Sequence, residues 1–315
     1  MRVLVSGGAG FIGSHIVDRM LADGHELAVI DDLSTGKREN VPAGARLFEL
    51  DLRDRDGVLR AVSEFRPTHV SHQAAQASVV VSVREPALDA SINVIGGLNL
   101  LDACTQAGGV ERFVFASTGG AIYGEVPEGT RATEEKAPAP ISPYAIHKLA
   151  FEQLLGVYER ERGLATRVLR YANVYGPRQD PHGEAGVVAI FIDAVLAGRP
   201  LRVNARSAQG DDGCVRDYVY VGDVAAANAL ALGGDIQESV LNVGTGGATT
   251  TRELAQSIMR VAGREVPTTA GDHRPGDLER SVLDRGRLAR YVSKAHDLSA
   301  GLAQTVEFMR RAKAG

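Results

Sequence analysis

The chain opens with an apolar run, Val3-Leu4-Val5, and then carries the stretch Gly7-Gly8-Ala9-Gly10-Phe11-Ile12-Gly13. An amphipathic helical pattern follows the last glycine. Glycines at this spacing let a strand turn sharply into a helix and leave the backbone open to a pyrophosphate, which the helix N-terminus favours. The stretch therefore predicts a strand, turn and helix that bind a dinucleotide. An ordinary glycine-rich turn in an unliganded βαβ unit is the alternative.

A carboxylate stands at the end of the second expected strand. This strand, Glu26-Leu27-Ala28-Val29-Ile30, runs directly into Asp31. A carboxylate at that place can accept hydrogen bonds from both ribose hydroxyls of NAD, and its charge disfavours the 2′-phosphate of NADP. The sequence therefore predicts NAD as the cofactor.

Bulk properties exclude several classes of protein. The 315 residues, 44% of them hydrophobic, suffice for one large α/β unit with a smaller lobe. The net charge of −4 gives no basic footprint for nucleic acid. Cys104 and Cys214 lack the spacing of metal ligands, so we expect no metal. A strand at the very start and the lack of a membrane-length apolar run predict a cytoplasmic protein without a membrane partner.

Strand and helix signals alternate through the first half of the chain. This alternation predicts a doubly wound parallel sheet with crossover helices. Further strands are expected at 46–50, 68–72 and 112–116. The small residues in Gln73-Ala74-Ala75-Gln76 suit either close approach of a cofactor or plain packing. Asp51 lies beside the adenine, caps a helix that begins near Asp54, or does both.

A long helical pattern runs from Leu88 to Ala107 and ends at Gly108-Gly109. Asn93 interrupts its apolar face. An asparagine inside a helix either faces solvent or bonds to a neighbouring group, and solvent is the default expectation.

The next helix carries candidate catalytic groups. Ser142-Pro143 marks its start, and Tyr144 and Lys148 are four residues apart, on one face of one turn. A buried ammonium beside a phenol favours the phenolate and lowers the phenol's pKa by about 1–3 units. Tyr144 is thus a candidate base at neutral pH. An exposed pair without function is the alternative.

Three segments together resemble the extended short-chain dehydrogenase/reductases that act on nucleotide sugars: Gly7 to Gly13, Ser117 to Gly124, and Tyr144 to Lys148. Other stretches extend this resemblance over nearly the whole chain; they are Leu169 to Arg178, Val215 to Asp223, Asn242 to Gly246, and Arg274-Pro275-Gly276-Asp277. The resemblance implies a Rossmann domain at residues 1–172 and a smaller α/β lobe for the nucleotide sugar at 173–315. Segments near 217–244 are expected to return to the first domain.

The resemblance also implies roles for particular residues. Those implied to be catalytic are Thr118, Tyr144 and Lys148. Those implied to bind NAD are Gly7, Gly10, Phe11, Ile12, Gly13, Asp31, Asp32, Leu33, Ser34, Thr35, Gly36, Asp51, Leu52, Gln73, Ala74, Ala75, Gln76, Asn93, Tyr144, Lys148 and Tyr171. Those implied to bind the UDP-sugar are Thr118, Tyr144, Asn173, Val187, Val188, Arg216, Arg274, Asp277 and Ser281. Without the resemblance, an exposed ion pair is the preferred interpretation of each arginine.

The segment after the fifth strand favours one reaction within this family. Members share oxidation of the sugar at C4, and dehydratases then use extra acidic residues at this place to eliminate water. Here the segment is Thr118-Gly119-Gly120, which offers no carboxylate. The resemblance therefore implies epimerisation at C4 of a UDP-hexose through a transient 4-keto sugar. Alternatives are a UDP-glucuronate 4-epimerase or decarboxylase, a keto-sugar reductase using Lys37 and Arg38 for NADPH, and an idle NAD-binding regulator.

Two further expectations concern breadth and assembly. Ser281 stands four residues after Asp277, where the family places a residue near the sugar's 2-substituent; its small side chain predicts activity on UDP-N-acetylhexosamines as well. The resemblance also implies a homodimer through the helices at about 88–107 and 144–162, although their apolar residues suit a core equally well.

Overall fold

The computed structural model describes residues 1–182, 186–274, 276–293 and 295–314. The chain forms two compact units and passes between them several times. The first unit comprises Met1–Thr118, Pro140–Arg170 and Ala225–Leu241, and the second comprises Gly119–Ala139, Tyr171–Val224 and Asn242–Gly315. The assignment of NAD to residues 1–172 and of the nucleotide sugar to 173–315 stays a prediction.

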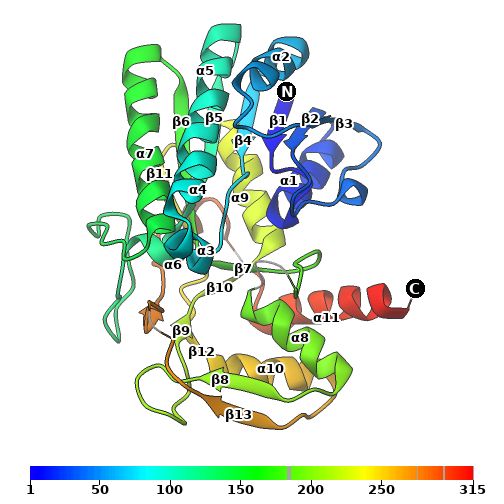
Figure 1. The fold of residues 1–315 in the computed structure, drawn as a ribbon, viewed down its shortest axis with the longest axis vertical. Coiled ribbons are helices and arrows are strands. Elements are labelled where there is room, and N and C mark those ends of the chain that lie inside the picture. The colour runs from blue at the N-terminus through cyan, green and yellow to red at the C-terminus, as the bar shows by residue number, and fades with distance from the viewer. Residues whose placement is uncertain (183–185, 275, 294, 315) are drawn as a thin grey trace. The chain divides into compact units, whose positions relative to one another are not determined.

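A seven-stranded sheet in the order β11-β6-β5-β4-β1-β2-β3 organises the first unit (Figure 1). The pairs from β3 through β2, β1 and β4 to β5 are parallel. The doubly wound α/β prediction is confirmed. The strands are β1 (Arg2–Ser6), β2 (Glu26–Asp31), β3 (Ala45–Glu49), β4 (His69–His72), β5 (Arg112–Thr118), β6 (Ala165–Tyr171) and β11 (Val240–Val243).

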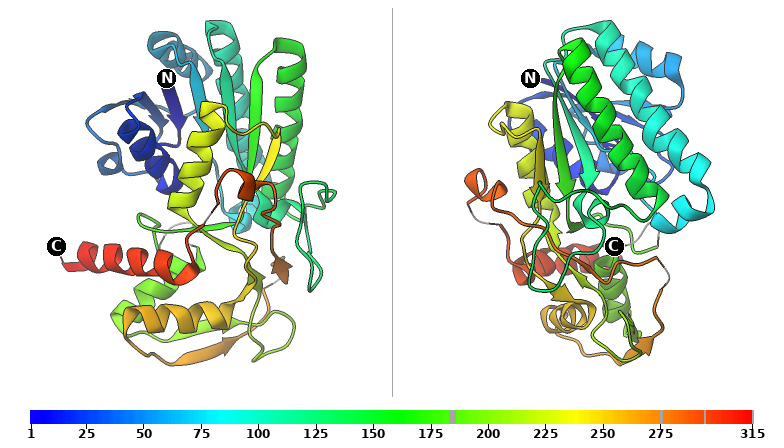
Figure 2. Two further views of the ribbon diagram at one scale, coloured as in Figure 1. Left: turned by 180° about the vertical axis from the view of Figure 1, so that it is seen from behind. Right: turned by 90° about the vertical axis from the view of Figure 1, so that its left-hand side faces the viewer.

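Helices cover both faces of this sheet. Figure 2 shows α5 and α7 side by side on one face and α9 on the other. Their bounds, with those of the shorter turns, are α1 (Phe11–Ala22), η1 (Arg38–Asn40), α2 (Arg55–Phe65), α3 (Val79–Arg84), α4 (Pro86–Ala90), η2 (Ser91–Gly96), α5 (Gly97–Ala107), α7 (Pro143–Arg162) and α9 (Val221–Gly233). Among the described residues, none of the helices has the length and apolar character needed to span a bilayer.

The core of the first unit lies between the sheet and α2, α5 and α7. Apolar side chains of alternating strand positions, such as Leu4, Ile30 and Phe113, meet Leu101 of α5 and Phe151 of α7, and all five are fully buried. Burial of such side chains contributes about 1.5–3 kcal/mol each. This packing holds the carboxyl ends of the strands at one edge of the sheet.

Local capping explains where two helices begin. The Ser142 hydroxyl accepts the N–H of Ala145 at 3.3 Å, and Pro143 takes the first helical position of α7, as predicted. The proposed cap by Asp51 is wrong. Asp54 caps α2 instead, because its carboxylate accepts the N–H of Gly57 at 3.0 Å.

The residues of the helical pattern from 88 to 107 belong to three consecutive elements, namely α4, the π-helical turn η2, and α5. The expectation that Asn93 faces solvent is wrong. Its side chain is 2% exposed and bonds to the backbone of Gln76 at both its oxygen and its nitrogen. The partner is 17 residues away in sequence, so no local pattern identifies it.

In the part of the second unit that the structure describes, there are short strands and four helices. Figure 1 shows α10 running along β8 and β13. The helices are α6 (Gly119–Ile122), α8 (Val187–Ala197), α10 (Thr251–Ala262) and α11 (Leu298–Ala314), with the 3-10 turn η3 (Leu288–Arg290). The strands are β7 (Asn173–Tyr175), β8 (Leu201–Asn204), β9 (Val215–Arg216), β10 (Tyr218–Tyr220), β12 (Thr249–Thr250), β13 (Thr268–Gly271) and β14 (Arg280–Ser281).

Candidate functional site

The glycine turn lies where the strand order of the first sheet reverses, between β1 and β4. Ligands of open α/β sheets bind at this kind of switch point. Gly7 has a φ of +69°, and a Cβ there would lie 2.6 Å from the backbone nitrogen of Ala74. Only glycine allows the turn after β1 to approach the segment after β4 so closely.

The start of α1 leaves its N-terminal N–H groups without a side-chain acceptor. Gly10 is the N-cap, makes no side-chain hydrogen bond, and the first turn holds no acidic residue. A Cβ at Gly13 would overlap the carbonyl oxygen of Gly7, so this glycine lets α1 pack directly on the turn. Backbone donors and the helix dipole together make this turn suitable for a diphosphate.

We expect Gly13→Ala to lower the free energy of unfolding by about 1–3 kcal/mol, because the added methyl group forces α1 away from the turn. The amount of NAD that copurifies should fall as well. Urea denaturation and absorbance of the released nucleotide measure the two effects. Gly156→Ala in α7 is the matched control, since a Cβ there meets nothing within 4 Å. Equal stabilities of the two variants would contradict this role of Gly13.

Asp31 ties the end of β2 to the glycine turn. Its two carboxylate oxygens accept the N–H groups of Ala9 and Leu33, each at 2.9 Å. Burial raises the pKa of Asp31, and the two backbone hydrogen bonds act against that increase. Each carboxylate oxygen has a second lone pair, so the group keeps acceptor capacity for ribose hydroxyls.

The loop after Asp31 contains the other residues expected to contact the ribose, and it folds back toward the Asp31 carboxylate. A Cβ at Gly36 would lie 2.6 Å from an oxygen of Asp31, so the loop returns closely to it. The Ser34 backbone N–H and hydroxyl both donate to Asp32, at 3.0 and 2.6 Å. Thr35 lies between these residues on the exposed part of the loop. The structure thus brings the predicted residues 31–36 together beside the turn.

Asp51 and Leu52 follow β3 on the neighbouring strand. Leu52 is buried against Gly96, whereas Asp51 remains partly exposed. The Arg53 guanidinium bonds to the Asp51 carboxylate and lowers the pKa of that group. Contact of this pair with an adenine stays a prediction.

The segment after β4 forms the other wall of the switch point. The Gln73 N–H donates to the carbonyl of Ser6 at 3.0 Å, and Ala74 lies against Gly7. Ala75 is half-buried, and Gln76 is held to Asn93 by two hydrogen bonds. The structure brings this predicted segment, the glycine turn and Asn93 together in one unit.

The three candidate catalytic residues come from β5 and α7. Thr118 is the last residue of β5 and, like Tyr144 near the start of α7, is half-buried. Lys148 is 3% exposed, and its ammonium donates to the carbonyl of Ala116 in β5 at 2.8 Å. Burial lowers the pKa of Lys148 to about 8, with the carboxylates of Asp89 and Glu152 acting in the opposite direction. A buried cation one turn after a phenol is the arrangement that favours its ionisation.

Sequence reasoning missed His72, which lies fully buried among Phe113, Phe115 and Phe151. Its Nδ1 bonds to the Ser6 hydroxyl at 2.6 Å. Burial, aided by the Lys148 charge, lowers the pKa of His72 to about 3. His72 is therefore neutral at physiological pH and adds no second positive charge next to Lys148.

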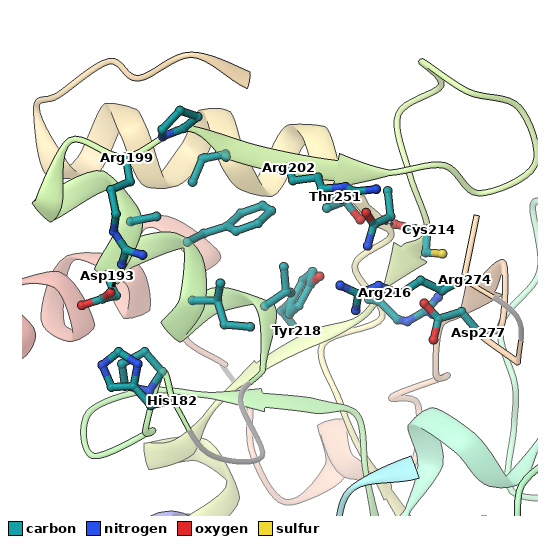
Figure 3. Close-up of a pocket in the computed structure, with 18 residues that line it drawn as sticks. His182, Asp193, Arg199, Arg202, Cys214, Arg216, Tyr218, Thr251, Arg274 and Asp277 are labelled. Carbon is teal, nitrogen blue, oxygen red and sulfur yellow. Dashed lines mark hydrogen bonds and ion pairs between the residues drawn. The ribbon is translucent and has the colours of Figure 1, made fainter. Parts of the chain in front are cut away.

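A cavity of about 420 Å³ lies within the second unit (Figure 3). Arg216, Arg274 and Asp277 lie together on one side of it, and Asp193 and Arg199 lie at the opposite end. The Arg216 guanidinium is anchored because it donates to the carbonyls of Val215 and Leu278. Val187, at the start of α8, also lines the cavity. The structure thus gathers four of the residues expected to bind the UDP-sugar.

Of the other residues expected to bind the UDP-sugar, Thr118 and Tyr144 belong to the first unit, and Val188, Asn173 and Ser281 lie elsewhere in the second. Val188 is buried, as is Tyr171, which is expected to bind NAD. The Asn173 amide donates to the carbonyl of Asp217 at 3.2 Å. Ser281 is 3% exposed and donates to the carbonyl of Gly120 at 3.0 Å. These residues are absent from the cavity lining, and Pro275 of the Arg-Pro-Gly-Asp stretch lies outside the described residues.

Comparison with known proteins shows the family. The model of the NAD dependent epimerase/dehydratase family matches residues 3–244. The chain belongs to this family. The chain is 43% identical over 317 residues to the UDP-glucose 4-epimerase of Mycolicibacterium smegmatis. The match covers 98% of the chain and 99% of that relative.

Two solved structures are similar along their full length. The crystal structure of Thermus thermophilus UDP-glucose 4-epimerase in complex with NAD is 60% identical, with a TM-score of 0.95, and the match covers 99% of this chain and 100% of that one. UDP-glucose 4-epimerase from Thermotoga maritima, crystallised with UDP-glucose, is 44% identical with a TM-score of 0.91, and the same shares are covered.

The first unit of this epimerase/dehydratase family member fits NAD, the cofactor of the family. Side chains at Gly7 and Gly13 would block the turn, and α1 presents N–H groups that no side chain caps. Asp31 adds a carboxylate beside that turn. A dinucleotide requires three features of its site: space for the pyrophosphate next to the backbone, backbone N–H donors, and an acceptor for the ribose hydroxyls.

Proposed function

We propose that this chain is a UDP-glucose 4-epimerase, which interconverts UDP-glucose and UDP-galactose through a transient 4-keto sugar. One observation carries the proposal: α7, which carries the Tyr144 phenol and a buried ammonium, packs against β5, and β5 ends in Thr118 followed by two glycines. This arrangement supplies a base for a hydroxyl proton but no carboxylate to drive elimination. The names and full-length similarity of the relatives support the same reaction.

The proposed chemistry divides the work among three side chains. Tyr144 takes the proton of the C4 hydroxyl, and Lys148 stabilises the phenolate that does so. Thr118 donates a hydrogen bond to the C4 oxygen. NAD, when bound, supplies the reversible oxidation of C4. The keto sugar rotates in the site so that the opposite face of C4 would receive the hydride back, and Tyr144 returns the proton to the C4 oxygen, which gives the C4 epimer.

We assign the diphosphate of the substrate to Arg216 and Arg274. Guanidinium groups bind phosphate oxygens through paired N–H donors. Both arginines line the cavity of the second unit, and backbone carbonyls already orient Arg216. Asn173, Val187, Val188, Asp277 and Ser281 complete the proposed set.

Separate incubations with UDP-galactose, UDP-N-acetylgalactosamine and UDP-glucuronate, without added cofactor, test the substrate. We expect NMR to detect UDP-glucose from the first and, because Ser281 is small, UDP-N-acetylglucosamine from the second. Conversion of UDP-glucuronate alone would favour the alternative 4-epimerase or decarboxylase. An enzyme active on UDP-galactose but inert toward the N-acetylated sugar would refute the breadth that we assign to Ser281.

A keto-sugar reductase that uses NADPH is less well supported. Such an enzyme needs a positive charge for the 2′-phosphate, and Arg38 already forms an ion pair with Glu49. The Asp31 carboxylate near the turn opposes a phosphate there. NAD in the purified protein supports the epimerase, whereas NADP would support the reductase.

We also propose a homodimer in the cytoplasm. Large apolar side chains are exposed on α3, η2 and α7, namely Val80, Val83, Ile95, Ile146 and Val157. These elements pack against one another, and exposed apolar side chains gathered on neighbouring helices favour association. Cys104 and Cys214 are both free thiols, which suits a reducing compartment. A single-chain mass in sedimentation equilibrium would exclude the dimer.

A further inference from the structure

The first unit contains a fully buried carboxylate that the proposed chemistry leaves unused. Asp89 of α4 is 0% exposed. One of its oxygens accepts the amide N–H of Gln76 at 2.5 Å, and the other lies 2.5 Å from Nδ1 of His147. A buried charge is retained at reasonable cost only when such partners satisfy it. Asp89 therefore joins α4 both to the segment after β4 and to α7.

The Gln76 side of this network is rigid. The Gln76 side chain bonds to Asp89 and also to the backbone of Ser78, and its main chain bonds twice to Asn93. Gln76 ends the segment that forms one wall of the switch point. The carboxylate of Asp89 is thus held in a fixed place relative to that wall.

The other partner of Asp89, His147, lies on α7, the helix that carries Tyr144 and Lys148. His147 immediately precedes Lys148 and lies three residues after Tyr144, and α4 packs against α7. A hydrogen bond at this position fixes the rotation and height of the first turns of α7. Small displacements matter there, because a misplacement of about 1 Å can reduce a rate by about 100-fold.

We propose, on the basis of the proposed epimerase function, that Asp89 and His147 form a positioning pair. The pair holds the turn of α7 that carries Tyr144 and Lys148 against the wall formed by Gln76. Neither side chain takes part in proton transfer from the sugar.

The Asp89 charge also acts on Lys148. The groups that act on this ammonium are Asp89 from α4, Glu152 from α7 itself, His72 from β4, and the Ala116 carbonyl from β5. Asp89 and Glu152 raise the pKa of Lys148 against the larger effect of burial, which lowers it to about 8. Neutralising Asp89 should therefore lower the pKa of Lys148 further, so that Lys148 loses its proton at a lower pH.

Three variants separate geometry from charge. His147→Leu removes the contact at a side chain that is 20% exposed, and Asp89 keeps its hydrogen bond from Gln76, so folding should survive. His147→Asn offers an amide nitrogen in place of Nδ1 and should restore the contact. Asp89→Asn removes the charge with little change in shape. Asp102→Asn is the matched control, because Asp102 accepts the hydroxyl of Tyr158 at 2.6 Å and so joins α5 to the far part of α7.

We expect His147→Leu to lower kcat for UDP-galactose by about 10-fold or more with KM changed less than about twofold. His147→Asn should retain most of kcat, and Asp102→Asn all of it. In Asp89→Asn, the fall of kcat at high pH should begin at a lower pH than in the parent enzyme. An unchanged kcat in His147→Leu, an equal loss in Asp102→Asn, or a fall of kcat that begins at the parent's pH in Asp89→Asn would overturn the proposal.

Amide hydrogen exchange without substrate tests the same pair independently of turnover. His147→Leu should speed exchange in a peptide covering residues 143–150, whereas Asp102→Asn should speed it in one covering 155–162. Unchanged exchange at 143–150 in His147→Leu would also overturn the proposal. A parent enzyme that fails to convert UDP-galactose contradicts the proposed function alone, since the exchange result stands without it.

Discussion

Tyr144→Phe is expected to lower kcat for UDP-galactose by about 10²–10⁴-fold, the usual contribution of a positioned acid–base group. The substitution removes only the phenolic oxygen, so the half-buried ring and α7 keep their packing. Initial rates followed by NMR measure the loss. The content of copurified NAD should remain that of the parent, because the glycine turn and Asp31 are untouched.

Tyr158→Phe is the matched control for this prediction. It makes the same change on the same helix, but the Tyr158 hydroxyl donates to Asp102 of α5 and has no proposed role in the chemistry. We expect its kcat to stay within about twofold of the parent value, as for a substitution outside the reacting groups. A Tyr144→Phe enzyme with full activity would remove Tyr144 as the base.

Arg170→Met is expected to lower the free energy of unfolding by about 3–5 kcal/mol, the usual cost of leaving a buried charge without its partner. Arg170 and Glu152 are 6% and 3% exposed, and the guanidinium donates to both carboxylate oxygens, at 3.0 and 2.5 Å. The Ser117 hydroxyl also donates to Glu152. Urea denaturation followed by far-ultraviolet circular dichroism measures the change.

Two further variants show whether the orphaned charge is the cause. The double variant Arg170→Met/Glu152→Leu removes both charges and should recover much of the lost stability. Arg19→Met breaks an exposed pair with Asp23 and should cost no more than about 1 kcal/mol. If Arg170→Met proves as stable as the parent, the buried pair does not hold α7 to β6.

Much of the first unit could be predicted from local sequence signals. Strand, glycine turn and helix follow one another at residues 2–22, and Ser142-Pro143 begins α7, because turns and caps depend on neighbours a few residues away. Asp31 likewise ends β2 as expected. These features place the candidate cofactor turn and the Tyr144 helix.

Contacts between distant segments could not be predicted. Asn93 was expected in solvent, yet it bonds to Gln76, and Asp89 was not singled out at all although it is fully buried. Both depend on the packing of α4 and η2 against the segment after β4, which no local pattern encodes. The cap of α2 was misplaced by three residues, since Asp51 and Asp54 are equally good capping residues by type.

Incubation of the purified enzyme with UDP-galactose in deuterium oxide, without added cofactor, tests the central claim most directly. We expect proton NMR to show UDP-glucose with ordinary hydrogen at C4, because the hydrogen taken from that carbon returns to it on the opposite face. Deuterium at C4, or no conversion by protein that retains its NAD, would contradict a 4-epimerase that oxidises and reduces the same carbon.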